Sequence, residues 1–409
     1  MTDDRFLTAP EAAAELGISL ATLYAYASRG MLRSEAVPGD PRARRYPRKD
    51  VERLKEKKEL RKEPERAVPK ALNWGAPVLE SAITLVQEGT LYYRGRNAVD
   101  LAWTASVEEV AALLWTGDPA DAERLFREEP PALPMPAASA LLAGDLTPVE
   151  RCQVALPLAG TVDLAAYDLR PAAAAATGAR ILKLLARIAA GLPSSDGSGI
   201  AATLQEGWAP GRPEAAGPIG SALILAADHE LNVSAFTARC VASAGATPYD
   251  VVTAGLAALK GSRHGGHTER MEALFREAGS AAGARRALAD RLRRGEEIPG
   301  FGQPLYPDGD PRGAALLGLA AEVAPGSPAV TCAQALAEAG RELLREHPTI
   351  DFGLVALARA LNLPEQTPLA LFALGRTLGW IGHALEEYAL GRLIRPRASY
   401  VGERPEGSS

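Results

Sequence analysis

Apolar residues recur at intervals of three and four positions along most of the chain, the spacing that places them on one face of an α-helix. This pattern predicts helices at residues 107–115, 178–191, 221–231, 333–347 and 367–389. Beyond residue 77, only the stretch TLYYRGR (90–96) reads as extended. We therefore expect an all-α fold, and the length of the chain allows two or three domains around a sizeable core.

Residues 7–58 have a different pattern, which predicts two short helices joined by a tight turn. Thr8 and Glu11 have the spacing of a capping box, in which two side chains satisfy the free amides at the start of a helix. Gly17 is expected to end this helix and Ser19 to begin the next. A turn-rich basic segment and a charged helix follow. This order is typical of a helix-turn-helix unit.

The charge of the chain supports a division into two modules. The net charge is −5, but residues 1–70 contain 16 Lys and Arg against 12 Asp and Glu, a net charge of +4. The remaining residues hold 29 basic and 38 acidic side chains, a net charge of −9. A basic head on an acidic body indicates two modules with different partners.

Several classes of protein are excluded by what the chain lacks. No uncharged apolar run approaches the length of about 20 residues that spans a bilayer, so we expect no membrane segment. The three cysteines (Cys152, Cys240 and Cys332) are scattered and lack CxxC spacing. This pattern argues against a disulfide framework or a structural zinc site, and it favours a reducing, cytoplasmic location. No dinucleotide-binding or Walker-type glycine motif is present in the required context.

Candidate chemistry lies in two glycine-rich loops. His264 stands in LKGSRHGGHTE, where the glycines after it allow a close approach of backbone or ligand. The loop IPGFGQPLYPDGDPR presents Gln303 and Arg312. A long irregular loop in a helical protein is commonly functional, and a guanidinium suits a carboxylate or phosphate. The alternatives are an ordinary loop histidine, and an arginine that caps a helix or pairs at the surface.

Three further charged residues complete the candidate set. Asp351 lies just ahead of a predicted helix, where aspartate is also a common N-cap. Arg376 falls inside an apolar helix, where a charge needs a partner or a ligand. Arg395 lies in LIRPRASYVG near the C-terminus. Several arginines with one histidine and one aspartate indicate a site for a di- or tri-anionic acid.

Seven segments carry a family resemblance: LYYRGR, DHELNVSAFTAR, LKGSRHGGHTE, GFGQPLYPDGDPR, PTIDFG, ALGRTLGWIGHALEE and RLIRPRASYVG. In this order they resemble the citrate synthases and 2-methylcitrate synthases over about residues 78–409. The resemblance implies a homodimer of helical subunits, each with a large and a small domain. The expected organisation is a winged helix-turn-helix domain (1–62), a linker (63–77), a large domain (78–268 and 371–409) and a small domain (269–370).

The same resemblance implies an acyltransferase that condenses acetyl-CoA, or a similar short acyl-CoA, with oxaloacetate to give citrate and free CoA. No cofactor and no metal are implied, because acyl-CoA is a substrate. His264 matches the histidine that hydrogen-bonds the thioester carbonyl, and Asp351 matches the base that removes the α-proton. A carboxylate base needs such an electrophile because a thioester α-proton is a poor acid.

Oxaloacetate binding is implied for His229, Arg312 and Arg376, and Arg395 matches an arginine supplied by the other subunit. Gln303 departs from the family, which has a histidine there that donates to the keto carbonyl. An amide can donate a hydrogen bond but cannot carry positive charge. We expect catalysis slower by about ten- to a hundredfold, the effect of losing about 1.5–3 kcal/mol, or a different keto acid.

The head resembles the winged helix-turn-helix domains of the MerR and excisionase type. The resemblance implies DNA contacts from the second helix and the basic wing, by Thr22, Tyr24, Arg29, Arg42, Arg44 and Arg45. The alternative is a small domain retained for packing or dimer contacts. A second hypothesis for the whole chain is a DNA-binding regulator whose body senses acyl-CoA or a carboxylic acid, with catalysis weakened by Gln303.

Overall fold

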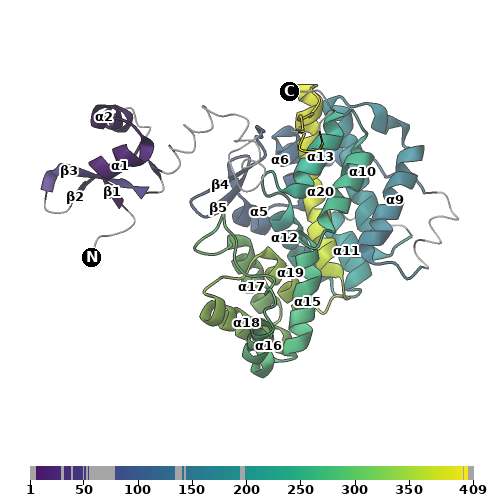
Figure 1. The fold of residues 1–409 in the computed structure, drawn as a ribbon. Helices are drawn as coiled ribbons and strands as arrows, with labels where there is room; N and C mark the ends of the chain where they lie inside the picture. Colours follow the sequence, from purple (N-terminus) through teal and green to yellow (C-terminus); the bar gives the residue numbers. More distant parts are fainter. Residues whose placement is uncertain are drawn as a thin grey trace. The chain divides into compact units, whose positions relative to one another are not determined.

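The structure is a computed structural model. It describes residues 6–28, 32–37, 40–48, 50–51, 54, 79–133, 141, 144–193, 199–398 and 400–403. The chain divides into two compact units, Met1–Glu80 and Ser81–Ser409 (Figure 1). The expected linker 63–77 and most of the expected charged helix fall outside the described residues.

The first unit contains two short helices and a three-stranded antiparallel sheet with the order β1-β3-β2. Its elements are β1 (Phe6–Thr8), α1 (Ala9–Leu16), α2 (Leu20–Ser28), β2 (Glu35–Val37) and β3 (Asp40–Pro47). The capping box of Thr8 and Glu11 is confirmed, and Gly17 ends α1 in a left-handed conformation. The Ser19 hydroxyl accepts the backbone N–H of Thr22 at the start of α2, as predicted.

The second unit begins with a small sheet of the order β4-β5-β6. Its strands are β4 (Thr84–Gln87), β5 (Thr90–Tyr93) and β6 (Arg96–Asn97). The sequence pattern predicted β5 and β6 but not β4. Both connecting turns place two residues at positive φ, Glu88 with Gly89 and Arg94 with Gly95, as tight β-hairpins require.

Helices form the rest of the second unit, which confirms the all-α class. The first group comprises α5 (Ala98–Thr104), α6 (Val107–Thr116), η1 (Pro119–Asp121), α7 (Ala122–Leu125), α9 (Pro148–Val162), η2 (Leu164–Tyr167), α10 (Pro171–Ala190), α11 (Ile200–Trp208), η3 (Pro213–Ala215), α12 (Ala216–Ala226), α13 (Val233–Ser243) and α14 (Pro248–Leu259). The second group comprises α15 (Gly266–Ala278), α16 (Ala281–Arg293), α17 (Pro311–Val323), α18 (Pro328–Leu344), α19 (Ile350–Ala360) and α20 (Thr367–Leu390).

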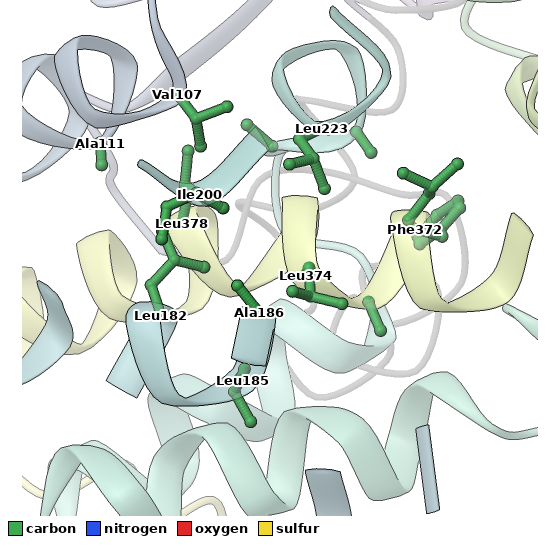
Figure 2. Packing of buried hydrophobic residues seen from close by; sticks show 14 of the residues in the cluster. Val107, Ala111, Leu182, Leu185, Ala186, Ile200, Leu223, Phe372, Leu374 and Leu378 are labelled. Atoms are coloured by element: carbon green, nitrogen blue, oxygen red, sulfur yellow. The ribbon is translucent and has the colours of Figure 1, made fainter. Parts of the chain in front are cut away.

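Helix α20 lies at the centre of the largest hydrophobic cluster and contacts α10, α12, α13 and α14 (Figure 1). Figure 2 shows Leu374 and Leu378 of α20 packed near Leu182 of α10 and Leu223 of α12. An apolar helix with almost every side chain buried must be surrounded by other helices, and α20 meets this condition.

A second hydrophobic cluster lies among α15, α16, α18 and α19, and Met271, Phe275 and Phe352 are members of it. The predicted helix 221–231 is too long at its C-terminal end, because α12 stops at Ala226 and the chain then turns. This difference matters for function, because His229 lies in a turn and not in a helix.

All three cysteines are free thiols. Over the described parts of the chain, no helix combines the length and apolar character needed to cross a membrane.

Candidate functional site

The turn after α12 packs closely against α20, because glycines on that helix leave room for its backbone. The N–H of Gly379 donates to the carbonyl of Ala227 at 3.0 Å, and Nε of Arg376 donates to the carbonyl of Ala226 at 2.8 Å. A Cβ on Gly379 would collide with the Ala227 carbonyl oxygen and with the Asp228 carboxylate. The glycines in GRTLGW therefore let the His229 turn approach the site.

Asp228 is fully buried beside this turn. Its carboxylate accepts a hydrogen bond from the Thr84 hydroxyl at 2.6 Å and lies 3.3 Å from Nε2 of His383. Although burial opposes ionisation, the neighbouring His383 and Arg376 lower the pKa of Asp228. The carboxylate therefore acts as a buried anchor between β4, the turn and α20.

His229 is buried, and its Nε2 is hydrogen-bonded to the hydroxyl of Tyr306 at 3.0 Å. Burial, followed by the charges of Arg312 and Arg376, lowers the pKa of His229 well below its usual value. Burial also raises the pKa of Tyr306 to about 12. Both side chains are therefore neutral at physiological pH and can exchange hydrogen bonds without a net charge.

Arg312 stands at the start of α17 and is almost completely buried. Its guanidinium donates two parallel hydrogen bonds to Asp310, from Nε at 2.9 Å and from Nη2 at 2.8 Å. Asp310 also accepts the backbone N–H of Ile350 at 3.1 Å, so it ties α17 to α19. Neither sequence alternative for Arg312, a helix C-cap or a surface pair, is therefore correct.

Arg376 is a buried cation inside α20. It is 1% exposed, and its Cζ lies 4.8 Å from the centre of the Phe372 ring. Burial lowers the pKa of Arg376, and within the described ranges no carboxylate lies at ion-pair distance from its guanidinium. A buried guanidinium in this condition favours an anionic ligand.

His264 lies in the turn between α14 and α15, as predicted. Its Nε2 is hydrogen-bonded to the Ser234 hydroxyl at 2.8 Å, and Trp380 Nε1 donates to the same oxygen at 3.1 Å. The ring meets Phe372 edge-on. Burial, with the charge of Arg376, lowers the pKa of His264 to about 3. The imidazole is therefore neutral and held in a fixed orientation.

Asp351 is the second residue of α19, which begins at Ile350. The N-cap alternative is therefore wrong, and its carboxylate instead accepts a hydrogen bond from the Thr268 hydroxyl at 2.7 Å. Burial raises the pKa of Asp351. A carboxylate with a raised pKa and a single hydrogen-bond donor has the properties of a general base.

Gln303 lies in the predicted irregular loop between α16 and α17. Its backbone carbonyl accepts the N–H of Tyr306 at 2.8 Å, and its side-chain oxygen lies 3.5 Å from the N–H of Leu305. The amide oxygen therefore faces its own loop, and among the described residues the NH₂ group has no hydrogen-bond acceptor. Gly302 and Gly309 adopt positive φ and shape this loop.

Five of the predicted residues form one cluster, in which the charge of at least one member shifts the pKa of another: His229, His264, Arg312, Asp351 and Arg376. Gln303 adjoins them through the turn that carries Tyr306. Arg395 is exposed, and no described contact joins it to the cluster.

Six residues that orient the cluster were not predicted: Asp228, Ser234, Thr268, Tyr306, Asp310 and Trp380. All six lie inside segments already identified for other residues. Their hydroxyl, carboxylate and indole groups, which can form hydrogen bonds to the site residues, could have indicated this role. Within the described ranges, no group of three or more His, Cys, Asp or Glu is placed to hold a metal ion.

In the first unit, the predicted DNA-contact residues differ in how exposed their side chains are and in whether they already have partners within the protein. Tyr24 and Arg44 are exposed. The Thr22 hydroxyl is hydrogen-bonded to Ser19. Arg45 pairs with Glu35 at 3.1 Å and stacks on the ring of Phe6. Arg29 and the side chain of Arg42 lie outside the described residues.

Comparison with known proteins identifies both modules. Residues 71–397 match the family described as citrate synthase, C-terminal domain, and residues 6–59 match a helix-turn-helix domain. Citrate synthase 2 of Bacillus subtilis (strain 168) is 31% identical over 353 residues, covering 80% of this chain and 94% of that protein. The 2-methylcitrate synthase of Mycobacterium tuberculosis (strain ATCC 25618 / H37Rv) is 32% identical over 354 residues, covering 80% and 89%.

Solved structures agree with these matches. Citrate synthase from Thermotoga maritima MSB8 superposes with a TM-score of 0.69 at 26% identity, covering 82% of this chain and 96% of that one. The citrate synthase of Thermoplasma acidophilum, solved in a ternary complex with carboxymethyl coenzyme A and oxaloacetate, gives a TM-score of 0.69 at 25% identity, with the same coverage. The chain therefore belongs to the citrate synthase family of acyltransferase-type condensing enzymes and carries a helix-turn-helix domain before its catalytic fold.

Proposed function

We propose that this protein condenses acetyl-CoA, or a similar short acyl-CoA, with oxaloacetate to release citrate and free CoA. The observation that carries the proposal is the buried Arg376, without a carboxylate partner, in a cluster with Asp351 and two neutral histidines. Such a cluster can bind a dicarboxylate and move one proton. The curated relatives named as citrate and 2-methylcitrate synthases support this reaction class.

In the first step, the carboxylate of Asp351 removes a proton from the α-carbon of the acyl-CoA. The C–H electrons move toward the thioester carbonyl, where His264 donates a hydrogen bond to the developing enolate oxygen. Whether His264 can donate this hydrogen bond depends on the direction of the hydrogen bond between its Nε2 and the Ser234 hydroxyl. When the serine hydroxyl donates to Nε2, the neutral ring carries its proton on Nδ1 and can donate it.

The same serine has a second possible acceptor, because its Oγ lies 2.7 Å from the side-chain oxygen of Asn232. If its proton points there, His264 must carry its own proton on Nε2 and loses the donor at Nδ1. Trp380 donates to the serine oxygen in either case. The productive arrangement is therefore the one in which Ser234 donates to His264.

In the second step, the enol carbon attacks the keto carbon of oxaloacetate, and a new C–C bond forms. The keto oxygen becomes an alkoxide and takes up one proton, which balances the proton that Asp351 removed, while Arg312 and Arg376 bind the substrate carboxylates. In this proposal, the Gln303 NH₂ group donates a hydrogen bond to the keto oxygen. Water then cleaves the thioester, so that the acyl carbon leaves as a carboxylate and the sulfur leaves as the CoA thiol.

Release of free thiol from acetyl-CoA in the presence of oxaloacetate tests this proposal. We expect thiol release to depend on both substrates. Absence of release with acetyl-CoA and propionyl-CoA across several keto acids would overturn it.

Three free thiols in the chain support a reducing, cytoplasmic setting for this reaction.

Replacing Gln303 by histidine is expected to raise kcat by about ten- to a hundredfold. An imidazolium adds positive charge to the hydrogen bond at the keto oxygen, and charge-assisted hydrogen bonds contribute about 1.5–3 kcal/mol. Steady-state rates with oxaloacetate measure this effect. Gln303→Asn is the matched control, since it keeps a neutral amide and should show no gain. An unchanged rate for Gln303→His would show that this site serves another substrate or none.

The residues of the cluster come from both of the proposed domains, the large domain (78–268 and 371–409) and the small domain (269–370). His229, His264 and Arg376 come from the first, and Gln303, Arg312 and Asp351 come from the second. Two separate hydrophobic clusters underlie these parts, although the first extends into α17, α18 and α19. Closure of one part on the other would bring base and electrophile together and exclude water.

We also propose a homodimer. Val154, Leu158 and Val162 are spaced four residues apart on α9 and form an apolar stripe on which Val154 and Val162 are exposed. Leu164 of η2 continues it and is 77% exposed. Exposed apolar stripes of this kind are typical of subunit interfaces. The exposed Arg395 would then be available to a partner's site.

Light scattering on the full chain is expected to give twice the chain mass. The double variant Val162→Asp/Leu164→Asp should shift it to the monomer, because two charges would be buried at the interface. Leu292→Asp, at a comparably exposed position on α16, is the control and should leave the mass unchanged. A monomeric wild-type chain that is fully active would contradict the dimer.

A second candidate function is a regulator that binds DNA through its head. The helix-turn-helix match and the exposed Arg44 favour it. Salt-sensitive binding to an upstream duplex, altered by acyl-CoA or oxaloacetate, would support this function. Affinity without salt dependence or sequence preference would exclude it.

A further inference from the structure

The outward face of α2 is unusual for a helix that enters a DNA groove. Leu20 is 42% exposed and Tyr24 is 50% exposed, and Ala21 and Ser28 are exposed with them. The helix reads LATLYAYAS and contains no charged residue and no side-chain amide. Arginine, asparagine and glutamine make the bidentate hydrogen bonds that read guanine and adenine. Helix α2 therefore lacks the usual means of direct readout.

The hydroxyl of Thr22 does not replace them, because it is hydrogen-bonded to Ser19 at 2.9 Å in the cap of α2. In the wing, Arg45 is held by Glu35 and Phe6. Arg44 on β3 is exposed, and residues 1–70 carry a net charge of +4. The head thus keeps an electrostatic attraction for phosphates, while the face of α2 offers mainly apolar contact.

We propose that α2 reads DNA through the methyl groups of thymine in the major groove. The thymine C5-methyl is the apolar group that base pairs present at that groove edge, and small apolar side chains and aromatic rings contact it. Leu20 and Tyr24 supply the contacts, and Ala21 allows close approach. This inference rests on the DNA binding proposed above and adds the chemical class of site that the head selects.

The spacing on the helix suits neighbouring bases. Leu20 and Tyr24 are four residues apart, a rise of about 6 Å along α2, and successive base pairs are about 3.4 Å apart. The two side chains therefore reach two nearby thymines. Burial of one methyl group changes affinity by about three- to fourfold, so two contacts give a combined effect of about tenfold.

The test uses the full chain and four GC-clamped duplexes of equal length. Their alternating cores are adenine–thymine, adenine–uracil, guanine–cytosine and guanine–5-methylcytosine. The first pair differs only in the thymine methyl, and the second pair adds a methyl at the equivalent place in the groove. We expect binding to weaken about tenfold from thymine to uracil, and to strengthen from cytosine to 5-methylcytosine.

Surface variants connect this effect to α2. Leu20→Ser and Tyr24→Ser alter exposed side chains, so the head should stay folded, and each should reduce the thymine–uracil difference. Arg44→Gln is the control, because it removes a phosphate contact and should weaken all four duplexes alike. Equal affinity for the thymine and uracil duplexes overturns the inference while leaving DNA binding intact. Failure to bind any duplex overturns both and indicates a protein partner for this face.

Discussion

Replacing Asp351 by asparagine is expected to lower kcat for citrate formation by about 10³-fold. The amide keeps the size of the side chain and can still interact with the Thr268 hydroxyl, but it cannot accept the α-proton. General base catalysis contributes about 10²–10⁴-fold, so a loss of this size follows from the base alone. Steady-state kinetics should show the loss in kcat, with KM for both substrates changed little.

Glu272→Gln is the matched control for this variant. Glu272 lies on α15, and burial raises its pKa as it raises that of Asp351, but its carboxylate accepts the backbone N–H of Gln366 and not a group of the site. We expect wild-type kcat for this control. If Asp351→Asn kept more than about a tenth of wild-type kcat, the assignment of the base would be wrong.

The pH dependence of kcat/KM gives an independent readout of the same group. Asp351 must be ionised to act, and burial raises its pKa above the usual value. Activity should therefore fall as the pH drops through this raised pKa. His264 has a pKa of about 3, and that of His229 is also far below its usual value, so both stay neutral across that range. We expect one acid limb and no loss of rate from histidine deprotonation near neutral pH.

The second large effect is expected at Arg376. Arg376→Gln should raise KM for oxaloacetate by about 10²–10³-fold, because removing the buried cation costs about 3–4 kcal/mol of binding to a carboxylate. KM for acetyl-CoA should change little. Wild-type protein should gain thermal stability from oxaloacetate, and the variant should lose that gain.

Arg291→Gln is the control for this substitution. Arg291 is also buried, but it pairs with Glu277 on α15, away from the cluster. Its loss should lower the free energy of unfolding and leave both KM values unchanged. A KM for oxaloacetate that stayed normal in Arg376→Gln would remove the argument for a dicarboxylate at this position.

The helical periodicity predicted the all-α class and five helices of the second unit, because long amphipathic and fully apolar stretches such as 367–389 leave few alternatives. It was wrong where tertiary contact overrides local pattern. The apolar pattern continues past Ala226, but the bond from Gly379 to Ala227 and the buried Asp228 hold the chain there as a turn. Strand β4 was missed because a short strand carries little periodicity until its pairing partner is known.

The candidate site shows a similar limit. The residue types around His264 and Arg312 pointed to a polyanionic acid, and the structure places both in one cluster with Arg376. Sequence could not predict which arginine is already neutralised, because the pairing of Arg312 with Asp310 depends on side-chain geometry. It also could not predict that Ser234, thirty residues before His264, is hydrogen-bonded to Nε2 of that ring.

The most direct test of the central claim is product formation by the full chain from acetyl-CoA carrying a ¹³C-labelled acetyl group. With oxaloacetate present, we expect labelled citrate and one CoA thiol for each citrate formed, and neither product from Asp351→Asn. Thiol release that is independent of oxaloacetate and leaves the label in acetate would contradict the account, because the cluster would then hydrolyse the thioester without forming a carbon–carbon bond.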